Sequence, residues 1–370
     1  MLCKSVKRTD ERGTQMTRAS RIMEKAGLQP GEAILLSKPS NIFYVSGYTG
    51  EGIALLAGDL CAIVTDFRYT EQVTRQAPGF EVFEIKTGQS HFALAAEVLA
   101  AHGVKAVRFE ADEVTVARFD KMKQDMPGFT LTALKGEPEQ VRRIKEPEEI
   151  ACIRKACDIS CKALANLLPR LKPGVSETDI RLDLEFEMLR LGGEGLAFNT
   201  IVASGTNGSL PHAIPGSRKV ELGDMITLDF GAKFGGYCAD MTRTVAVGEP
   251  GAEMKKIYGI VLKAQQTAQD ALHAGVPANS IDKIARDIIA GEGYGKYFGH
   301  GLGHSVGIDI HEDPRLSPTC QDILTVGTTM TVEPGIYVPG LGGVRIENTC
   351  VIGETASETL VTAPKELLIL

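Results

Sequence analysis

The sequence predicts a smaller α/β domain followed by a larger α+β domain. Its 370 residues exceed the usual length of a single domain. Over residues 17–136, short helical patterns alternate with short apolar runs, which is typical of an α/β domain. Residues 137–147 are strongly charged, and beyond them long amphipathic helices accompany runs rich in Val, Ile, Thr and Gly. We therefore expect a linker at 137–147 and a second domain over residues 148–370.

The composition excludes several classes of protein. Hydrophobic residues make up 43% and charged residues 24%, the balance of an ordinary globular protein. The net charge of −7 argues against a nucleic-acid partner, and no apolar run is long enough for a membrane helix. The polar N-terminus lacks the apolar core of a secretory signal, and eight scattered cysteines without a CxxC pair favour reduced thiols. These features predict a cytoplasmic protein with no membrane partner.

The helices and strands expected in the first domain follow from short apolar runs that are interrupted by glycines and polar residues. The first 16 residues have no hydrophobic periodicity, so we expect a disordered tail there. Glycines close two expected helices, Gly27 the first and Gly103 the second. The elements expected in chain order are a helix at 19–28, strands at 32–37 and 61–67, a helix at 93–103 and a strand at 104–110.

The second domain is expected to begin with two helices. Apolar residues recur at three- and four-residue steps from Ile150 to Leu164, which predicts a long amphipathic helix with Pro147 in its first turn. A second helix is expected over 176–192, because Ser176 and Asp179 resemble a capping box. Strand-like segments follow, and the helices that interrupt them are expected at 252–274 and 280–291.

Four carboxylates interrupt apolar strand-like runs in the second domain. Residues 225–247 predict a hairpin that carries Asp229 and Asp240, and two later runs carry Glu333 and Glu347. Taken singly, the aspartates could occupy edges or turns, and Arg345 could form a structural ion pair with Glu347, since both point to one face of an ideal strand. Buried carboxylates each need a compensating partner, whereas two divalent cations would satisfy all four together.

The segment "FGHGLGHSVGIDIHED" can add an imidazole to these carboxylates. It contains His300, His304 and His311 among glycines that disfavour a helix. A helical zinc-protease motif needs Glu where Gly301 stands, and the spacing of a dinucleotide-binding loop is absent. A loop with one metal ligand and several substrate-orienting or acid–base histidines fits better, and His212 could join from another loop. One imidazole with several carboxylates suits Mn²⁺, Co²⁺ or Zn²⁺.

Taken together, these motifs resemble a known family. The ordered set "TLDFGAKFGGYCADMTRT", "FGHGLGHSVGIDIHEDP", "TVEPGIYVPG" and "GGVRIEN" is similar to metallopeptidases of the creatinase/aminopeptidase, or pita-bread, fold. Within it, the chain most resembles the proline-specific members, aminopeptidase P and prolidase. The segments "SNIFYVSGYTGEG" and "TDFRYTEQ" resemble the smaller N-terminal domain of that family. The resemblance implies an α/β creatinase-like domain, an α+β pita-bread catalytic domain and a homodimer.

The resemblance also implies a reaction and a role for each site residue. Two divalent ions, most simply Mn²⁺ with Co²⁺ or Zn²⁺ as alternatives, would hold a bridging hydroxide that cleaves the N-terminal Xaa-Pro bond of peptides or dipeptides. Asp240 and Glu347 would bridge both ions, and Glu333 would also transfer the proton. Arg345 matches an active-site arginine. The implied metal ligands are Asp229, Asp240, His304, Glu333 and Glu347, and the implied substrate-orienting histidines are His212, His300 and His311.

Three alternatives within the superfamily account less well for the sequence. Creatinase lacks the full ligand set, and non-enzymatic binding relatives have lost ligands. Methionine aminopeptidase has the five ligands but normally lacks a large N-terminal domain and the "HGLGH" pair. The chain departs from the family at Asn348, where an aspartate commonly follows the last ligand, and at "CA" before Asp240. These departures leave the preferred metal open, and the sequence leaves the choice between dipeptides and longer peptides open.

Overall fold

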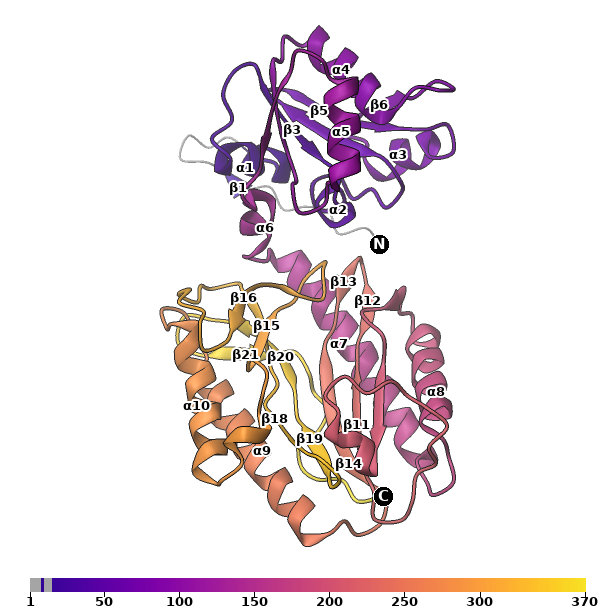
Figure 1. Ribbon diagram of the computed structural model, residues 1–370, viewed down its shortest axis with the longest axis vertical. Coiled ribbons are helices and arrows are strands. Elements are labelled where there is room, and N and C mark those ends of the chain that lie inside the picture. The colour runs from indigo at the N-terminus through magenta and orange to yellow at the C-terminus, as the bar shows by residue number, and fades with distance from the viewer. Residues whose placement is uncertain (1–7, 10–14) are drawn as a thin grey trace. The chain divides into compact units, whose positions relative to one another are not determined.

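The computed structural model describes residues 8–9 and 15–370 (Figure 1). The expected tail over residues 1–16 falls largely outside the described residues. Within it, β1 (Arg8–Thr9) pairs antiparallel with β2 (Gln15–Met16). The remaining chain divides into two compact units, one ending at Arg142 and the other beginning at Arg143. This division lies inside the expected linker.

The N-terminal unit is built on one six-stranded mixed sheet. The strand order is β6-β5-β4-β3-β7-β8, in which β4 runs antiparallel to both of its neighbours and the other pairs are parallel. The strands are β3 (Glu32–Leu36), β4 (Ile53–Ala57), β5 (Leu60–Thr65), β6 (Glu81–Glu84), β7 (Ala106–Phe109) and β8 (Thr130–Ala133). The helices are α1 (Arg18–Lys25), α2 (Pro39–Ser46), α3 (Thr70–Gln76), α4 (His91–Ala101), α5 (Val116–Asp125) and α6 (Glu137–Arg142).

The core of this unit explains why its central strands are continuous apolar runs. Ala33 and Leu35 of β3 pack in one cluster with Leu99 of α4 and Met122 of α5. Ile34, which points to the opposite face of the sheet, is also fully buried. A strand covered on both faces has no reason to alternate with polar residues. The expected helices and strands of this domain are therefore confirmed, with ends shifted by a few residues.

Helix α6 occupies half of the expected linker and belongs to the N-terminal unit. Its last residue, Arg142, is buried and donates hydrogen bonds to Ser40 Oγ at 3.0 Å and to Asn41 Oδ1 at 2.6 Å. The charged sequence of this stretch contains no apolar periodicity that would predict a helix. Docking of Arg142 onto the start of α2 is a tertiary interaction, so the sequence pattern did not reveal it.

The C-terminal unit packs two helix pairs around strands (Figure 1). Helix α7 packs beside α8 and against β12, and α9 packs beside α10 and against β19. The helices are α7 (Pro147–Leu167), α8 (Glu177–Arg190), α9 (Ala252–Asp270) and α10 (Ala278–Gly291), and short 3₁₀ turns occupy 168–170, 205–209 and 295–297. The expected α+β organisation of this domain is confirmed. No helix among the described residues is both long and apolar enough to cross a membrane.

The strands of this unit form several small sheets. Strands β10-β11-β14, β13-β12-β9 and β16-β15-β17-β20-β21 are hydrogen-bonded in these orders, and β18 pairs with β19. Their bounds are β9 (Gly195–Leu196), β10 (Ile201–Ser204), β11 (Met225–Phe230), β12 (Ala232–Phe234), β13 (Tyr237–Cys238), β14 (Met241–Ala246), β15 (Gly303–Ser305), β16 (Glu312–Leu316), β17 (Thr329–Val332), β18 (Gly335–Val338), β19 (Gly342–Arg345), β20 (Asn348–Ile352) and β21 (Ser357–Thr359).

Local signals in the sequence set the helix starts as expected. Pro147 is the first residue of α7, and Ser176 caps α8 by accepting a hydrogen bond from the Asp179 N–H at 3.1 Å. Helix α9 ends at Asp270, four residues before the expected end, and α10 begins at Ala278. The seven cysteines in the described part of the chain form no disulfide with one another.

Candidate active site

One cavity of the C-terminal unit, with a volume of about 430 Å³, collects the candidate residues. All nine side chains singled out by the sequence line it, although they come from segments spread over more than 130 residues. They are His212, Asp229, Asp240, His300, His304, His311, Glu333, Arg345 and Glu347. The fold therefore assembles the carboxylates, the histidines and the arginine around a single space.

The predicted hairpin places the two aspartates. Strands β11 and β14 pair antiparallel with Asp229 opposite Thr242, and Asp240 directly precedes β14. At Gly231 a Cβ atom would lie 1.8 Å from the carbonyl oxygen of Ala239, so only glycine permits this close approach. The Asp240 carbonyl accepts a hydrogen bond from Thr349 Oγ1 at 2.7 Å, which fixes the backbone at this aspartate.

Glu333 directly follows β17 and Glu347 directly precedes β20, and both side chains line the cavity. The Glu333 N–H donates to Leu302 O at 2.8 Å, and its Oε1 accepts from Thr331 Oγ1 at 3.1 Å. The Glu347 N–H donates to Thr242 O at 3.1 Å, and its Oε2 accepts from Thr242 Oγ1 at 2.7 Å. Thr242 therefore holds both the backbone and the side chain of Glu347.

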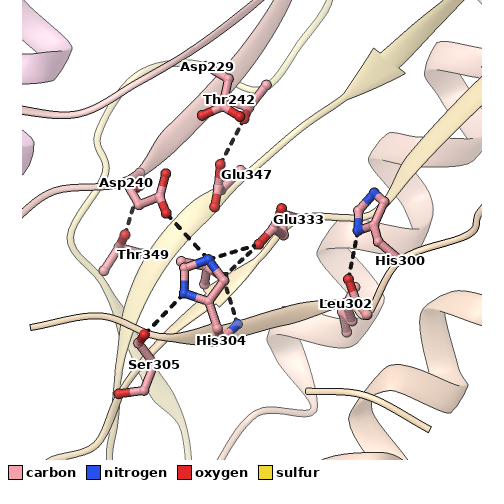
Figure 2. A network of polar contacts seen from close by, with 12 residues as sticks. Asp229, Asp240, Thr242, His300, Leu302, His304, Ser305, Glu333, Glu347 and Thr349 are labelled. Carbon is pink, nitrogen blue, oxygen red and sulfur yellow. Dashed lines mark hydrogen bonds and ion pairs between the residues drawn. The ribbon is translucent and has the colours of Figure 1, made fainter. Parts of the chain in front are cut away.

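His304 lies on β15 with its ring directed at the carboxylates (Figure 2). Its Nε2 is 3.3 Å from Glu333 Oε1 and 3.5 Å from Asp240 Oδ2, and its Nδ1 is 3.0 Å from Ser305 O. A hydrogen on Nδ1 would satisfy the Ser305 carbonyl and leave the Nε2 lone pair for a metal ion. The expected non-helical backbone is confirmed, although His304 lies on a short strand rather than in a loop. At Gly303 a Cβ would lie 2.1 Å from Thr331 O.

The donor set fits divalent cations. Asp240, His304 and Glu347 each offer a ligand atom within 4.8 Å of the others. Among the described residues, Asp229 Oδ1 and Glu347 Oε1 are buried without a hydrogen-bond partner. A buried carboxylate oxygen with no donor is costly, and a cation removes that cost. Carboxylate oxygens with one imidazole are the ligands that Mn²⁺, Co²⁺ and Zn²⁺ accept.

The electrostatics of the carboxylates also indicate a cation site. Burial raises the pKa of Asp240 well above its usual range, and the charges of Glu347 and Asp229 add to the shift. Burial likewise raises the pKa of Glu347 and of Asp229. For Glu333, burial acts upward too, but the hydrogen bond and charge of His304 outweigh it and bring the pKa to about 2. The carboxylates thus repel one another in a space that positive charge would stabilise.

A chain of hydrogen bonds connects His300 to Asp229. His300 Nε2 is 2.9 Å from the Tyr337 hydroxyl, which accepts from Arg345 Nη1 at 2.8 Å. Arg345 Nη2 then donates to Asp229 Oδ2 at 2.5 Å. The simple sequence interpretation of an ion pair between Arg345 and Glu347 is wrong, because β19 ends at Arg345 and Glu347 lies past the strand end. Burial lowers the pKa of His300 and so favours the neutral ring.

The other histidines line the cavity together with further residues that the sequence did not single out. The rings of His304 and His311 meet edge to face with centroids 4.5 Å apart, and burial lowers the pKa of His311. Tyr337 and Arg315 also line the space. Arg315 stands opposite His304 in the β15–β16 pairing. Tyr337 lies within the motif "TVEPGIYVPG", and Arg315 directly follows the motif that ends at Pro314; these positions were the only available signal.

Comparison with known proteins extends over nearly the whole chain. Residues 151–354 match metallopeptidase family M24, and residues 15–144 match the creatinase/prolidase N-terminal domain. The uncharacterized peptidase YqhT of Bacillus subtilis is 41% identical over 340 residues, 92% of this chain and 96% of that protein. A solved Xaa-Pro dipeptidase from Bacillus anthracis is 37% identical with a TM-score of 0.91, covering 95% and 99% of the two chains. An X-Pro aminopeptidase from Thermotoga maritima is 35% identical with a TM-score of 0.88, covering 94% and 100%.

These likenesses agree with the architecture and with the site. The N-terminal match ends close to the division between the two compact units. The C-terminal match contains every one of the nine candidate residues. The chain belongs to metallopeptidase family M24 and is a metal-dependent peptidase with a creatinase/prolidase N-terminal domain and a catalytic domain of the pita-bread fold.

Proposed function

We propose that the protein is a Xaa-Pro peptidase, which removes the first residue from dipeptides or peptides with proline at position two. The observation that carries the proposal is the set of convergent carboxylates and His304, in which two buried carboxylate oxygens have no donor among the described residues. The Xaa-Pro dipeptidase and X-Pro aminopeptidase structures that share the fold support the substrate class.

We assign the metal centre to five side chains: Asp229, Asp240, His304, Glu333 and Glu347. They would hold two divalent ions, most simply Mn²⁺ with Co²⁺ or Zn²⁺ as alternatives, and Asp240 and Glu347 would be shared by both. The ions, when bound, lower the pKa of water and polarise the scissile carbonyl. Four carboxylates balance the charge of two such ions. The unpartnered oxygens of Asp229 and Glu347 also favour the binding of cations.

The residues of the chain divide the remaining work. Glu333 takes the proton from the attacking water and passes it to the leaving proline nitrogen, which departs as an amine. His212 and His311 orient the substrate from the walls of the cavity. His300 Nδ1 lies 2.8 Å from Gly301 O, so a neutral ring carries its hydrogen on Nδ1 and accepts the Tyr337 hydroxyl hydrogen at Nε2. Arg345 donates to the same hydroxyl oxygen, which holds these three side chains in one orientation. Groups that hold the substrate in a reactive orientation lower the activation barrier of peptide hydrolysis without themselves taking part in bond making or breaking.

The chemistry of the Xaa-Pro bond suits this cavity. Its nitrogen carries no hydrogen and its ring restricts φ, so a pocket that needs an N–H donor handles it poorly. The cavity offers the apolar side chains of Phe198, Ile201 and Ile310 beside the histidines. The acidic centre favours a free substrate amino group with its positive charge. Acetylation of that group would remove the attraction.

Arg315 bears on the length of the substrate. It places a positive charge at the cavity that contains the acidic centre. A Xaa-Pro dipeptide has a carboxylate directly after the proline, which this cation attracts, whereas a longer peptide has a neutral amide there. We therefore propose dipeptides as the better substrates. We also propose that the protein is cytoplasmic, on the basis of its composition, and that it is a homodimer, on the basis of the family resemblance. Light scattering of the purified protein measures the oligomeric state.

The decisive experiment compares matched peptides with the metal-loaded enzyme. We expect kcat/KM for a Xaa-Pro dipeptide to exceed that for the Xaa-Ala dipeptide with the same first residue by at least about tenfold, a difference of about 1.4 kcal/mol in transition-state stabilisation. A Xaa-Pro-Pro tripeptide is expected to fall between them. Equal values for Xaa-Pro and Xaa-Ala would leave a metallopeptidase standing and remove the proline assignment.

A further inference from the structure

Arg243 lies behind the metal-ligand segments rather than in the active-site cavity. It follows Thr242 on β14, and successive side chains of a strand point to opposite faces. Thr242 faces Glu347, as its hydroxyl bond shows, so Arg243 points the other way. The residue is only 2% exposed and lines a separate, largely apolar cavity of about 280 Å³. A buried guanidinium at this place requires an explanation.

Every N–H of the Arg243 guanidinium has an acceptor. The group has five donors in a fixed planar arrangement, and the structure supplies five acceptors from three separate segments. These are Pro364 O for Nε at 2.7 Å, Thr242 O and Glu347 O for Nη1 at 2.8 and 2.5 Å, and Asn348 Oδ1 and Ala363 O for Nη2 at 2.8 and 2.6 Å. Arg243 therefore ties the start of β20 to β14 and to the C-terminal segment.

Asn348 extends this set of bonds to the segment of a second ligand. Its Nδ2 donates to Gln269 Oε1 at 2.8 Å, and Gln265 Nε2 donates to the same oxygen at 2.9 Å. Gln265 Nε2 also lies 3.5 Å from Val332 O, immediately before Glu333. An asparagine at 348 serves as acceptor for Arg243 and as donor to Gln269 at once. The buried polar network is satisfied on both sides, which favours a single arrangement.

The acceptors of Arg243 are all neutral, so the effect of its hydrogen bonds on the backbone can be distinguished from the effect of its positive charge. Four are backbone carbonyls and one is the Asn348 amide oxygen. No salt bridge of Arg243 occurs within the described residues, so the cation is held by hydrogen bonds to neutral acceptors. Removing the positive charge would by itself favour cation binding nearby, whereas losing the bonds would release the backbone of Glu347. The two effects have opposite signs and can be measured separately.

We propose that Arg243 is a positioning residue for the metal centre. Its guanidinium, with Asn348, fixes the backbone at Glu347 so that the Glu347 carboxylate is presented to the ions in one geometry. The proposal rests on the metal centre proposed above. Partners that hold metal ligands typically change metal affinity by about 10–100-fold when they are lost.

Arg243→Lys is the primary test, because it keeps the charge and cannot reproduce the planar five-donor arrangement. Arg243→Met removes the charge as well. The readout is the Mn²⁺ binding isotherm of chelator-treated full-length protein, together with kcat and KM at saturating Mn²⁺. We expect the Mn²⁺ Kd to rise about 10–100-fold in Arg243→Lys. In Arg243→Met we expect a smaller rise, because loss of the positive charge partly offsets loss of the bonds. We expect KM at saturating metal to stay close to that of the wild type. Asn348→Ala, which deletes one acceptor, is expected to shift Kd in the same direction.

The control is Arg154→Lys, on α7, whose exposed ion pair with Glu358 lies on the surface and contributes little. Its Mn²⁺ Kd should match that of the wild type. A folded Arg243→Lys protein with a Kd within twofold of the wild type would overturn the proposal, as would tighter binding by Arg243→Met. If Arg243→Lys does not fold, Asn348→Ala decides by the same criterion. Wild-type protein that fails to bind Mn²⁺, Co²⁺ or Zn²⁺ would instead contradict the metal centre itself.

Discussion

Glu333 is assigned two roles, as a metal ligand and as the group that moves the proton. Its Oε1 accepts a hydrogen bond from Thr331 Oγ1 at 3.1 Å and lies 3.3 Å from His304 Nε2. Glu333→Gln preserves the shape and one oxygen but cannot carry a proton near neutral pH. We expect kcat to fall by about 10²–10⁴-fold, the usual contribution of general acid–base catalysis. The measurement is kcat at saturating Mn²⁺ with the bound metal quantified in the same sample. A variant with near-normal kcat would remove Glu333 from the mechanism.

Helix α2 of the N-terminal unit depends on one buried carboxylate that follows β7. Glu110 Oε2 accepts from the N–H groups of Ser37 and Lys38 at 2.5 and 2.7 Å, and Oε1 accepts from Asn41 Nδ2 at 2.6 Å. Burial raises the pKa of Glu110 to about 7 despite these donors. A folded-state pKa above the unfolded value stabilises the fold below about pH 4.5, and this stabilisation is lost as the pH rises to about 7.

We therefore expect Glu110→Gln to flatten the pH dependence of unfolding. Relative to the variant, the wild type should lose up to about 3 kcal/mol of unfolding free energy between about pH 4.5 and 7. Urea unfolding of both proteins across this range measures the difference. Glu81→Gln, an exposed position on β6, is the matched control and should follow the wild type. Parallel profiles for wild type and Glu110→Gln would contradict this role of Glu110.

The proposed metal centre joins segments from β11 to the start of β20, so metal binding should stabilise the protein as a whole. Without cations, Asp229 Oδ1 and Glu347 Oε1 stay buried without a donor among the described residues, and the carboxylates repel one another. Binding to the folded state alone contributes about 2.7 kcal/mol per site at a free metal concentration of 100 times Kd. We expect exhaustive chelation to abolish activity and to lower Tm by several degrees, and Mn²⁺, Co²⁺ or Zn²⁺ to restore both. Full activity in verified metal-free protein would refute the dinuclear mechanism.

The sequence by itself determined the two-domain order and the nine candidate residues. Carboxylates such as Asp229 and Glu347 are anomalies within apolar strand patterns, and anomalies of that kind are visible locally. Glycine-rich surroundings likewise indicated that His304 is not on a helix, which β15 confirms. Helix starts at Pro147 and Ser176 were predictable because capping is a short-range effect.

Tertiary structure alone decided which of these groups meet. Arg345 bonds to Asp229, 116 positions away along the chain, and not to its neighbour Glu347. The charged stretch 137–142 forms helix α6, and its last residue, Arg142, docks on Ser40 and Asn41. Arg243 gathers acceptors from three segments, although its own strand pattern marks it only as one polar residue in a buried run. Hydrogen bonds between side chains far apart in the sequence depend on distances in space. The periodicity and spacing of a sequence do not specify these distances, because they are set only when strands and helices pack.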